Sequence, residues 1–352
     1  MTEQVGTNFV HGIKQAATWG TGLLVGSGNK YNFISEGLAP DSQLIRSAAL
    51  NGSPFRSGGR KGNELHAGPV RWPLDYETAH FLMALSFGSV VAPVQQGTNL
   101  SWLHEIVVAS SDKGIFANHV FGEADQYIRD YPTVKHGDIT IRIASGDEEP
   151  YIEAQCVPYR LLVDQSGAND VSTIGNLTHR AEEALVEFKD LKMYMADQST
   201  STAIDENHEP FYINSFELRL VKNLRQSSVT TRNAPYTDEP IRNGWFDVQF
   251  TVGVAEVEDN LRLNEYLSKG KKMAIVRATG TVIEETFPFE IEFQLPQFQW
   301  LNLNDFNIDG PEIIAPTLIA DCSKPAVSIA GFAHTDAVRA FVTNTDPNAA
   351  IT

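Results

Sequence analysis

The sequence predicts a mainly β protein made of two tandem β-sandwich or barrel domains, each flanked by one α-helix. Three observations support this prediction: long segments in which apolar and polar residues alternate, two short segments with helical spacing, and the same order of elements in both halves of the 352-residue chain. Because a domain usually holds roughly 100–200 residues, the length also favours two domains, which we place at residues 1–175 and 176–352.

Four segments alternate with a period of two, which is typical of strands that bury one face. In each segment every second residue is apolar, and most of the residues between are polar. The segments are DITIRI (138–143), FELRL (216–220), WFDVQFTVGV (245–254) and FPFEIEFQL (287–295). In the last two, the polar face carries Asp247, Glu290 and Glu292.

Two segments predict short helices with a cap at each end. In DYETAHFLMALSFGS (75–89), Asp75 is the expected N-cap and Gly88 ends the helix after a stripe of apolar residues. In DNLRLNEYLSKG (259–270), Asp259 and Gly270 take the same roles, and the apolar stripe includes Leu267.

The two predicted helices stand in matching contexts. Each follows a strand, a long polar loop (51–64 or 225–243) and a second strand, and each precedes a third strand: WLHEIVVAS (102–110) or KKMAIVRAT (271–279). The two N-caps are 184 residues apart and the two glycines 182, from 259 − 75 and 270 − 88. This agreement predicts a tandem duplication.

The composition excludes several classes of protein. A formal net charge of −17 argues against binding to a phosphate backbone, which needs clustered Lys and Arg. Two distant cysteines, Cys156 and Cys322, predict a reducing compartment without a disulfide framework. The start of the chain lacks the apolar core of a secretory signal, and no apolar run approaches the roughly 20 residues that span a bilayer. We therefore expect a soluble protein that is made in the cytoplasm.

A glycine-rich segment, WGTGLLVGSGNK (19–30), suggests a phosphate-binding loop, but its spacing is wrong. Asn29 separates the last glycine from Lys30, whereas a Walker loop joins them directly. Val25 stands where the dinucleotide fingerprint needs its third glycine. We therefore predict a plain Gly-rich segment and no nucleotide cofactor.

Other candidate sites also lack a necessary part. SSDK (110–113) matches a Ser-x-x-Lys nucleophile pattern, but it lies in a polar turn without the companion motifs. DFNIDGPEIIAP (305–316) begins like a calcium loop, yet Pro316 replaces the bidentate glutamate at position twelve, so an Asx-rich turn is expected. The nine histidines are dispersed along the sequence. We therefore predict no catalytic residues, no metal site and no cofactor.

The first half of the chain contains four segments in this order: IKQAATWGTG (13–22), SQLIRSAAL (42–50), GPVRWPLDYETAHFLMALSFGS (68–89) and DITIRI (138–143). This order resembles that of the tail tube proteins of long-tailed bacteriophages. Three segments of the second half are similar to the second tube domain of the family's tandem form: FELRLVKNL (216–224), WFDVQFTVGVAEVEDNLRLNEYLSKG (245–270) and FPFEIEFQLPQFQW (287–300). The resemblance spans residues 10–345 and rests on element order and scattered hydrophobic, Gly and aromatic positions. It favours a strand for LKMYMAD (191–197), although residues 181–191 also fit a helix by spacing.

The resemblance implies a structural virion protein and no enzyme. Three chains of two tail-tube domains would form a ring with pseudo-sixfold symmetry, and the rings would stack into a hollow tail tube, assembled in the host cytoplasm, that conducts DNA to the host. The expected partners are further copies of the chain and the tape measure, tail terminator and baseplate or tip proteins. DNA would pass without specific binding, because an acidic lumen repels phosphates.

Two sets of charged residues are the candidate functional residues. The loops 51–64 and 225–243 are net positive in an acidic chain, and we predict that they make contacts between rings. The residues concerned are Arg56, Arg60, Lys61, Arg225, Arg232 and Arg242. Because alternation turns Asp247, Glu290 and Glu292 away from the core, their side chains are expected to face either the lumen or the outer surface of the tube, and we favour the lumen.

Two alternative functions remain. Five Trp and ten Tyr in a β protein could also serve a carbohydrate-binding or hydrolytic β-sandwich. The chain could instead be another virion part with the tube fold, such as a baseplate hub or a capsid decoration protein. Self-association separates a ring subunit from a lectin or hydrolase, which forms a discrete species.

Overall fold

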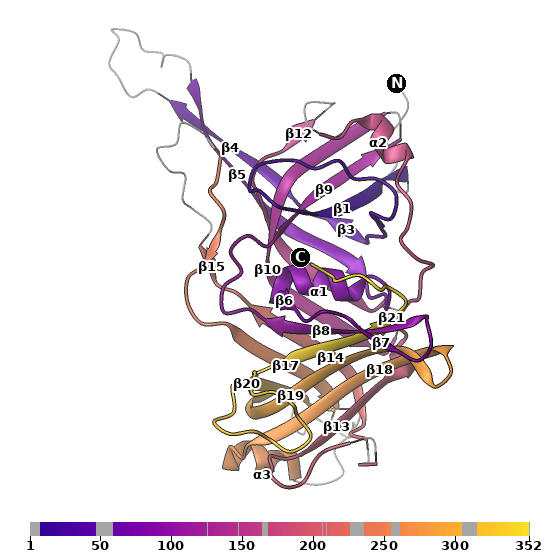
Figure 1. Ribbon diagram of the computed structural model, residues 1–352. Helices are drawn as coiled ribbons and strands as arrows, with labels where there is room; N and C mark the ends of the chain where they lie inside the picture. The colour runs from indigo at the N-terminus through magenta and orange to yellow at the C-terminus, as the bar shows by residue number, and fades with distance from the viewer. Residues whose placement is uncertain are drawn as a thin grey trace.

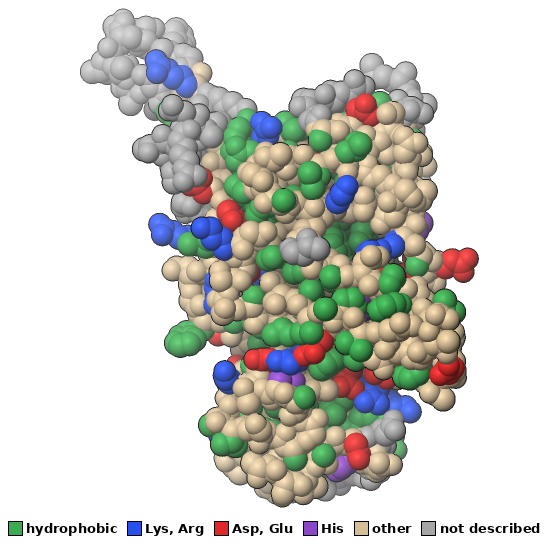
Figure 2. Space-filling view, viewed as in Figure 1, with side chains coloured by type: hydrophobic (Ala, Val, Ile, Leu, Met, Phe, Trp, Pro, Cys, Tyr) green, Lys and Arg blue, Asp and Glu red, His purple; other side chains and the backbone are tan. Residues whose placement is uncertain are grey.

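The computed structural model describes residues 8–46, 59–124, 126–146, 148–163, 168–205, 207–208, 210–225, 236–254, 261–304 and 315–351. The prediction of a mainly β fold is confirmed, with 52% of the chain in strands and 9% in helices. In Figure 1 the first half of the chain occupies the upper part of the molecule and most of the second half the lower part. On the face shown in Figure 2, acidic and basic side chains are interspersed rather than gathered in one patch.

The first half contains twelve strands and two of the three helices in the described part of the chain. The strands are β1 (Val10–Ala16), β2 (Lys30–Tyr31), β3 (Ser35–Glu36), β4 (Ala39–Arg46), β5 (Gly59–Pro73), β6 (Gly88–Val90), β7 (Val94–Gln96), β8 (Ser101–Val108), β9 (Phe116–Glu123), β10 (Tyr127–Ala144), β11 (Tyr151–Pro158) and β12 (Leu162–Val163). The helices are α1 (Ala79–Phe87) and α2 (Val171–Gly175).

The second half contains the remaining strands and one helix. The strands are β13 (Leu191–Asp197), β14 (Ile213–Val221), β15 (Leu224–Arg225), β16 (Ile241–Arg242), β17 (Asp247–Val254), β18 (Lys272–Glu284), β19 (Phe287–Asn304), β20 (Thr317–Cys322) and β21 (Arg339–Asn344). The helix is α3 (Leu261–Ser268), and a 3-10 turn spans Phe188–Asp190. LKMYMAD is therefore the predicted strand, and the alternative of a helix over 181–191 is wrong.

Antiparallel pairing joins the two halves into one sheet system. The 18-residue strand β10 pairs along one edge with β9 and then, from Ile139 to Ala144, with β14 of the second half. Its other edge pairs with β11 and β12. The C-terminal strand β21 lies between β19 and β8, so it makes a second connection between the halves. Only β15 and β16 form a separate two-stranded ribbon among the described strands.

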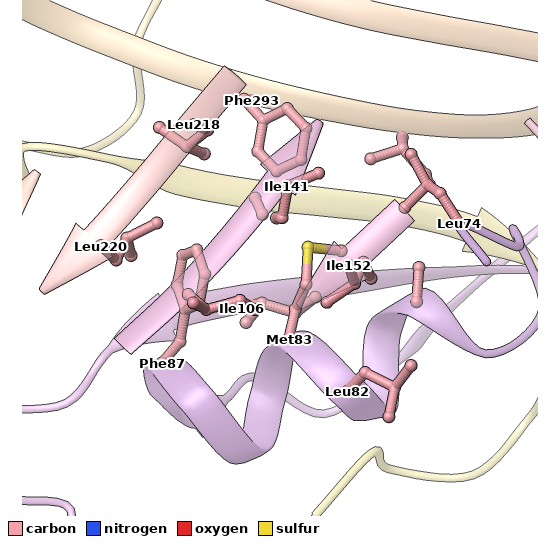
Figure 3. Close-up of a cluster of buried hydrophobic side chains, with 14 of the residues drawn as sticks. Leu74, Leu82, Met83, Phe87, Ile106, Ile141, Ile152, Leu218, Leu220 and Phe293 are labelled. Atoms are coloured by element: carbon pink, nitrogen blue, oxygen red, sulfur yellow. The ribbon is translucent and has the colours of Figure 1, made fainter. Parts of the chain in front are cut away.

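The core lies where the two halves meet, around α1. All nine residues of this helix are buried, because strands from both halves pack around it. Figure 3 shows Met83 and Phe87 of α1 among Leu218 and Leu220 of β14 and Ile141 of β10. One continuous cluster of buried hydrophobic residues therefore extends through both halves.

The predicted strand faces are confirmed in the core. Ile139, Ile141 and Ile143 of β10 are buried, as are the alternate residues of FELRL and the apolar residues from Val248 to Val254. Pairing between distant strands fixes which face of each strand is buried, since a shift of one residue would turn every apolar side chain of these strands to the other face.

The structure corrects the predicted start of the first helix and the predicted end of the second. Thr78, not Asp75, is the N-cap of α1, and Asp75 instead accepts a bond from the Glu77 backbone N–H (2.7 Å) in the preceding turn. Gly88 ends α1 with a φ of 90°, as predicted. At α3 the left-handed residue is Lys269, with a φ of 51°, rather than Gly270. Asp259 lies outside the described residues.

The predicted stripe of α3 is also wrong in one position, because Leu267 points to solvent. The first polar loop is shorter than predicted as well. Residues 59–64 belong to β5, since they pair with β4. In the second loop, β15 and β16 pair at its two ends. Residues 51–58 and 226–235 lie outside the described residues.

Candidate assembly surfaces

The first predicted assembly loop is carried by a long hairpin of β4 and β5, which projects from the body of the molecule (Figure 1). Arg60 is exposed on β5 and Lys61 follows it, whereas Arg56 lies outside the described residues. Two apolar side chains of β4 are also exposed, Leu44 at 59% and Ile45 at 58%. Exposed apolar residues on a projecting hairpin are typical of a surface that contacts another molecule.

The second predicted loop is fastened to its own chain at its C-terminal end. Trp19 Nε1 donates to the Thr237 carbonyl (3.0 Å), and Glu239 accepts a bond from the Gly114 N–H (2.7 Å). Arg242 donates to the Ser110 carbonyl (2.6 Å).

Arg242 is therefore used within the chain, and it is half-buried. Arg225 on β15 is exposed, and Arg232 lies outside the described residues. A role of these arginines between rings stays a prediction.

The structure separates the three acidic residues that were predicted to share a face. Glu290 and Glu292 lie on β19 beside Arg277, whose Nη2 is 2.6 Å from Glu292 Oε2 and whose Nε is 3.5 Å from Glu290 Oε2. Glu292 is buried. Asp247 is exposed at the start of β17, where it accepts a bond from Asn223 Nδ2 (3.2 Å), and β20 lies between it and β19. Whether any of them faces a lumen stays a prediction.

The Gly-rich segment 19–30 packs on the first half of the chain. The backbone N–H groups of Leu23 and Val25 donate to Asn118 Oδ1 (2.8 Å) and Asn169 Oδ1 (2.9 Å). Both asparagine side chains in turn donate to the carboxylate of Asp130. These backbone N–H groups therefore serve the fold.

Sequence reasoning missed a chain of three buried histidines. Trp72 Nε1 donates to His11 Nδ1 (3.1 Å), His11 Nε2 lies 3.2 Å from His119 Nδ1, and His119 Nε2 lies 3.0 Å from His136 Nε2. Because an indole N–H can only donate, it fixes the direction of every bond in the neutral chain and leaves the proton of His136 on Nδ1.

The three histidines are kept neutral by their surroundings. Burial lowers the pKa of His119 to about 3, and burial together with the neighbouring histidines lowers the pKa of His11 and His136 well below the usual value. In the described part of the chain, no group of His, Cys, Asp or Glu has the geometry to hold a metal ion. Strands β1, β9 and β10 bring these histidines together, so no spacing in the sequence could have revealed them.

A second buried polar cluster links the two halves. Lys135 Nζ lies 3.0 Å from Glu239 Oε1, and Lys222 Nζ lies 3.2 Å from Asp112 Oδ2. Burial and the positive charge of Lys135 lower the pKa of Lys222 to about 8, although the negative charge of Asp112 acts to raise it. Asp112 and Lys135 come from the first half and Lys222 and Glu239 from the second, so the ion pairs cross the junction.

The C-terminal residues form a third buried network against α1. Asp346 Oδ2 lies 3.0 Å from His80 Nε2 and 2.7 Å from Arg180 Nη1. Although burial acts to raise the pKa of Asp346, its hydrogen bonds from His80 and Asn348 hold it well below the usual value. Glu77 also accepts a bond from Thr345 Oγ1 (2.6 Å). The network fixes the end of the chain to α1.

No protein-family model matches the chain, and no curated protein sequence is significantly similar to it. Among the described residues, no helix has the length and apolar character needed to cross a membrane.

Proposed function

We propose that the chain is a structural subunit of a bacteriophage tail tube, which forms rings that stack into a hollow conduit for DNA. The observation that carries this proposal is a repeated pattern of strand pairing, which supports two tandem domains in one chain. Two similar domains per chain suit a ring in which three chains supply six similar positions.

The repeated pattern covers eight elements in the same chain order. In the first half β1 pairs with β9, β9 with β10, β10 with β11 and β12, β11 with β5, and β5 with β3. In the second half β13 pairs with β18, β18 with β19, β19 with β20 and β21, β20 with β17, and β17 with β14. Helix α1 follows β5 as α3 follows β17.

The repeat differs from the sequence prediction in one element. WLHEIVVAS, which forms β8, was matched with KKMAIVRAT of β18, but the pairing pattern matches β18 with β9. Strands β6, β7 and β8 are then an insertion between α1 and β9, and β8 instead pairs with the C-terminal strand β21.

A carbohydrate-binding protein is less well supported. Stacking on a sugar needs aromatic faces gathered at one surface. Trp72 and Trp300 are buried and Trp19 packs on Phe116, so Trp245, 87% exposed, is the one Trp that projects fully into solvent. A single exposed indole is also typical of a protein contact.

The proposal is tested by the assembly state of the purified full-length protein. Negative-stain microscopy should show rings or tubes, and native mass spectrometry of released rings should give a multiple of three chains. A single species of one or two chains at all concentrations would contradict the proposal. A stable six-chain ring would contradict the pseudo-sixfold arrangement alone.

A further inference from the structure

The turn between β16 and β17 carries Asn243 followed by Gly244, which is the one Asn-Gly pair in the described part of the chain. Both residues are exposed. Gly244 has a φ of 144°, in a region that L side chains rarely adopt. A Cβ built on Gly244 would meet only side-chain atoms of Asn223, the nearer at 3.7 Å, so the space beside the Gly244 backbone is open.

The backbone on each side of this pair is held in place by Asn223. The Asn243 N–H donates to the Asn223 carbonyl (3.0 Å), and Asn223 Nδ2 donates to the Trp245 carbonyl (3.0 Å). Within the described residues, neither the Asn243 side chain nor the Gly244 N–H has a hydrogen-bond partner. The turn therefore presents an amide side chain and the backbone nitrogen that follows it, and the fold engages neither.

We infer that Asn243 is a site of spontaneous deamidation, in which the Gly244 nitrogen attacks the side-chain amide carbon of Asn243. The Gly244 N–H gives its proton to water or hydroxide, the N–Cγ bond forms, and the Cγ–Nδ2 bond breaks as Nδ2 takes up a proton and leaves as ammonia. Water then opens the resulting five-membered cyclic imide at either carbonyl, which gives aspartate or isoaspartate. One water enters and one ammonia leaves, and nothing is oxidised or reduced.

Glycine after the asparagine favours this reaction, because no Cβ obstructs the nitrogen and the chain can rotate into the geometry that closes the ring. Asn223 provides the comparison within the chain. It is also exposed, but Leu224 follows it, and its Nδ2 donates to the Trp245 carbonyl and to Asp247 Oδ2 (3.0 and 3.2 Å). The fold therefore restrains the amide of Asn223.

The reaction changes both the charge and the backbone of this turn. Loop 225–243 holds three arginines against Asp238 and Glu239, so one new carboxylate at position 243 cancels its net positive charge. Isoaspartate also adds a methylene to the main chain between the two hydrogen bonds of Asn223, so both bonds cannot keep their geometry. The effect of this charge on assembly rests on the proposed function, whereas the reaction itself needs only the single chain.

Peptide mass spectrometry of stored full-length protein tests the inference. Cleavage after glutamate releases residues 240–256, in which Asn243 is the only asparagine. Conversion of the amide to a carboxylate should be at least about tenfold faster at Asn243 than at Asn223, a barrier difference of about 1.4 kcal/mol. It should be faster in mildly alkaline than in neutral buffer, because the attacking nitrogen must lose its proton, and an isoaspartate-specific methyltransferase should label the product. Equal conversion at the two asparagines would overturn the inference.

Asn243→Gln is the matched variant, because it keeps the amide but would have to close a six-membered ring. It should slow conversion at position 243 at least about tenfold and leave Asn223 unchanged. Undiminished conversion in this variant would contradict attack by the Gly244 nitrogen.

A synthetic peptide of residues 240–256 separates the effect of the turn from that of the sequence. Position 243 in the folded protein should convert within about tenfold of the rate in the peptide, since the turn leaves both reacting groups accessible. A folded chain that converts more slowly than this protects Asn243, which would also overturn the inference. Protein that never assembles contradicts the proposed function alone, because the reaction takes place within one chain.

Discussion

Helix α1 follows strand β5 and helix α3 follows strand β17, yet the surroundings of the two helices are opposite. Every residue of α1 is buried; its apolar side chains pack on strands of both halves, and His80 contacts Asn344 and Asp346 near the C-terminus. In α3 only Glu265 is buried, where its carboxylate meets Arg262 and Lys272 (2.8 and 2.7 Å) and accepts a bond from Trp300 Nε1.

The difference lies in what covers each helix rather than in the helix itself. β14 and the C-terminal segment close over α1, whereas no described segment of the chain closes over Leu267 of α3. A helix that is apolar all round belongs in an interior, and an amphipathic helix at the end of a molecule needs a cover for its remaining apolar side chains. The comparison therefore leads to the expectation that α3 is covered only after assembly.

The largest expected effect is the loss of stability in acid, which should come mainly from the half that contains α1, although burial also lowers the pKa of His334 in the second half to about 4. Burial lowers the pKa of His104, which packs on His80 of α1, to about 4 and that of His119 to about 3, and the pKa values of His11 and His136 are lowered well below the usual value. The unfolded chain, with His pKa values near 6.5, then binds more protons below that pH, so stability is complete above about pH 7 and is lost as the pH falls.

Between pH 7.5 and 5.5 each of these four histidines should remove about 1.3 kcal/mol, or about 5 kcal/mol together. Urea unfolding at the two pH values measures this loss. A loss below about 1 kcal/mol would show that these histidines are not held neutral in the folded protein.

The next effect is the loss of a core contact of α1. Phe87→Ala should lower the free energy of unfolding by about 4 kcal/mol, because it leaves a cavity among β14 and β10 residues that cannot collapse. Equilibrium urea unfolding provides the value. A change below about 1.5 kcal/mol would mean that the junction around α1 is loosely packed.

A smaller effect is expected from the polar network that fixes the C-terminus to α1. Asp346→Ala should cost about 3 kcal/mol in urea unfolding, because it leaves His80 and Arg180 without their shared carboxylate. Asp205→Ala, which removes an exposed partner of His208, is the control and should cost much less. If Asp346→Ala and Asp205→Ala lower the free energy of unfolding equally, the network around Asp346 does not stabilise the fold.

The smallest effect is predicted for α3. Leu267→Ala should change the free energy of unfolding of the single chain by less than about 0.5 kcal/mol, because the side chain is already in water. The measurement is urea unfolding at a protein concentration too low for assembly. A cost above about 1.5 kcal/mol would mean that α3 is packed within the single chain.

Much of the fold could be predicted from the sequence because its strands bury one face each. The alternation of DITIRI and WFDVQFTVGV placed Ile141 and Phe250 in the core correctly. Alternation cannot say what covers the other face, so the burial of Glu292 against Arg277 was not foreseen.

The sites depended on pairing between distant strands, which leaves no local signal. The histidine chain joins residues 108 and 17 positions apart, and the Lys222–Asp112 pair spans 110 positions. Leu267 was assigned to a buried stripe because helical spacing identifies an apolar face without identifying the surface that covers it. The hairpin of β4 and β5 extended further than expected because GRKGNE (59–64) is polar on both faces yet pairs along its length.

A density map of the assembled particle that resolves helices would test the central claim most directly. The account predicts a ring in which α1 and α3 alternate at six similar positions, each α3 covered by a neighbouring chain. A map in which α3 lies on an outer surface without a neighbouring chain, or in which the particles contain one or two chains, would contradict it.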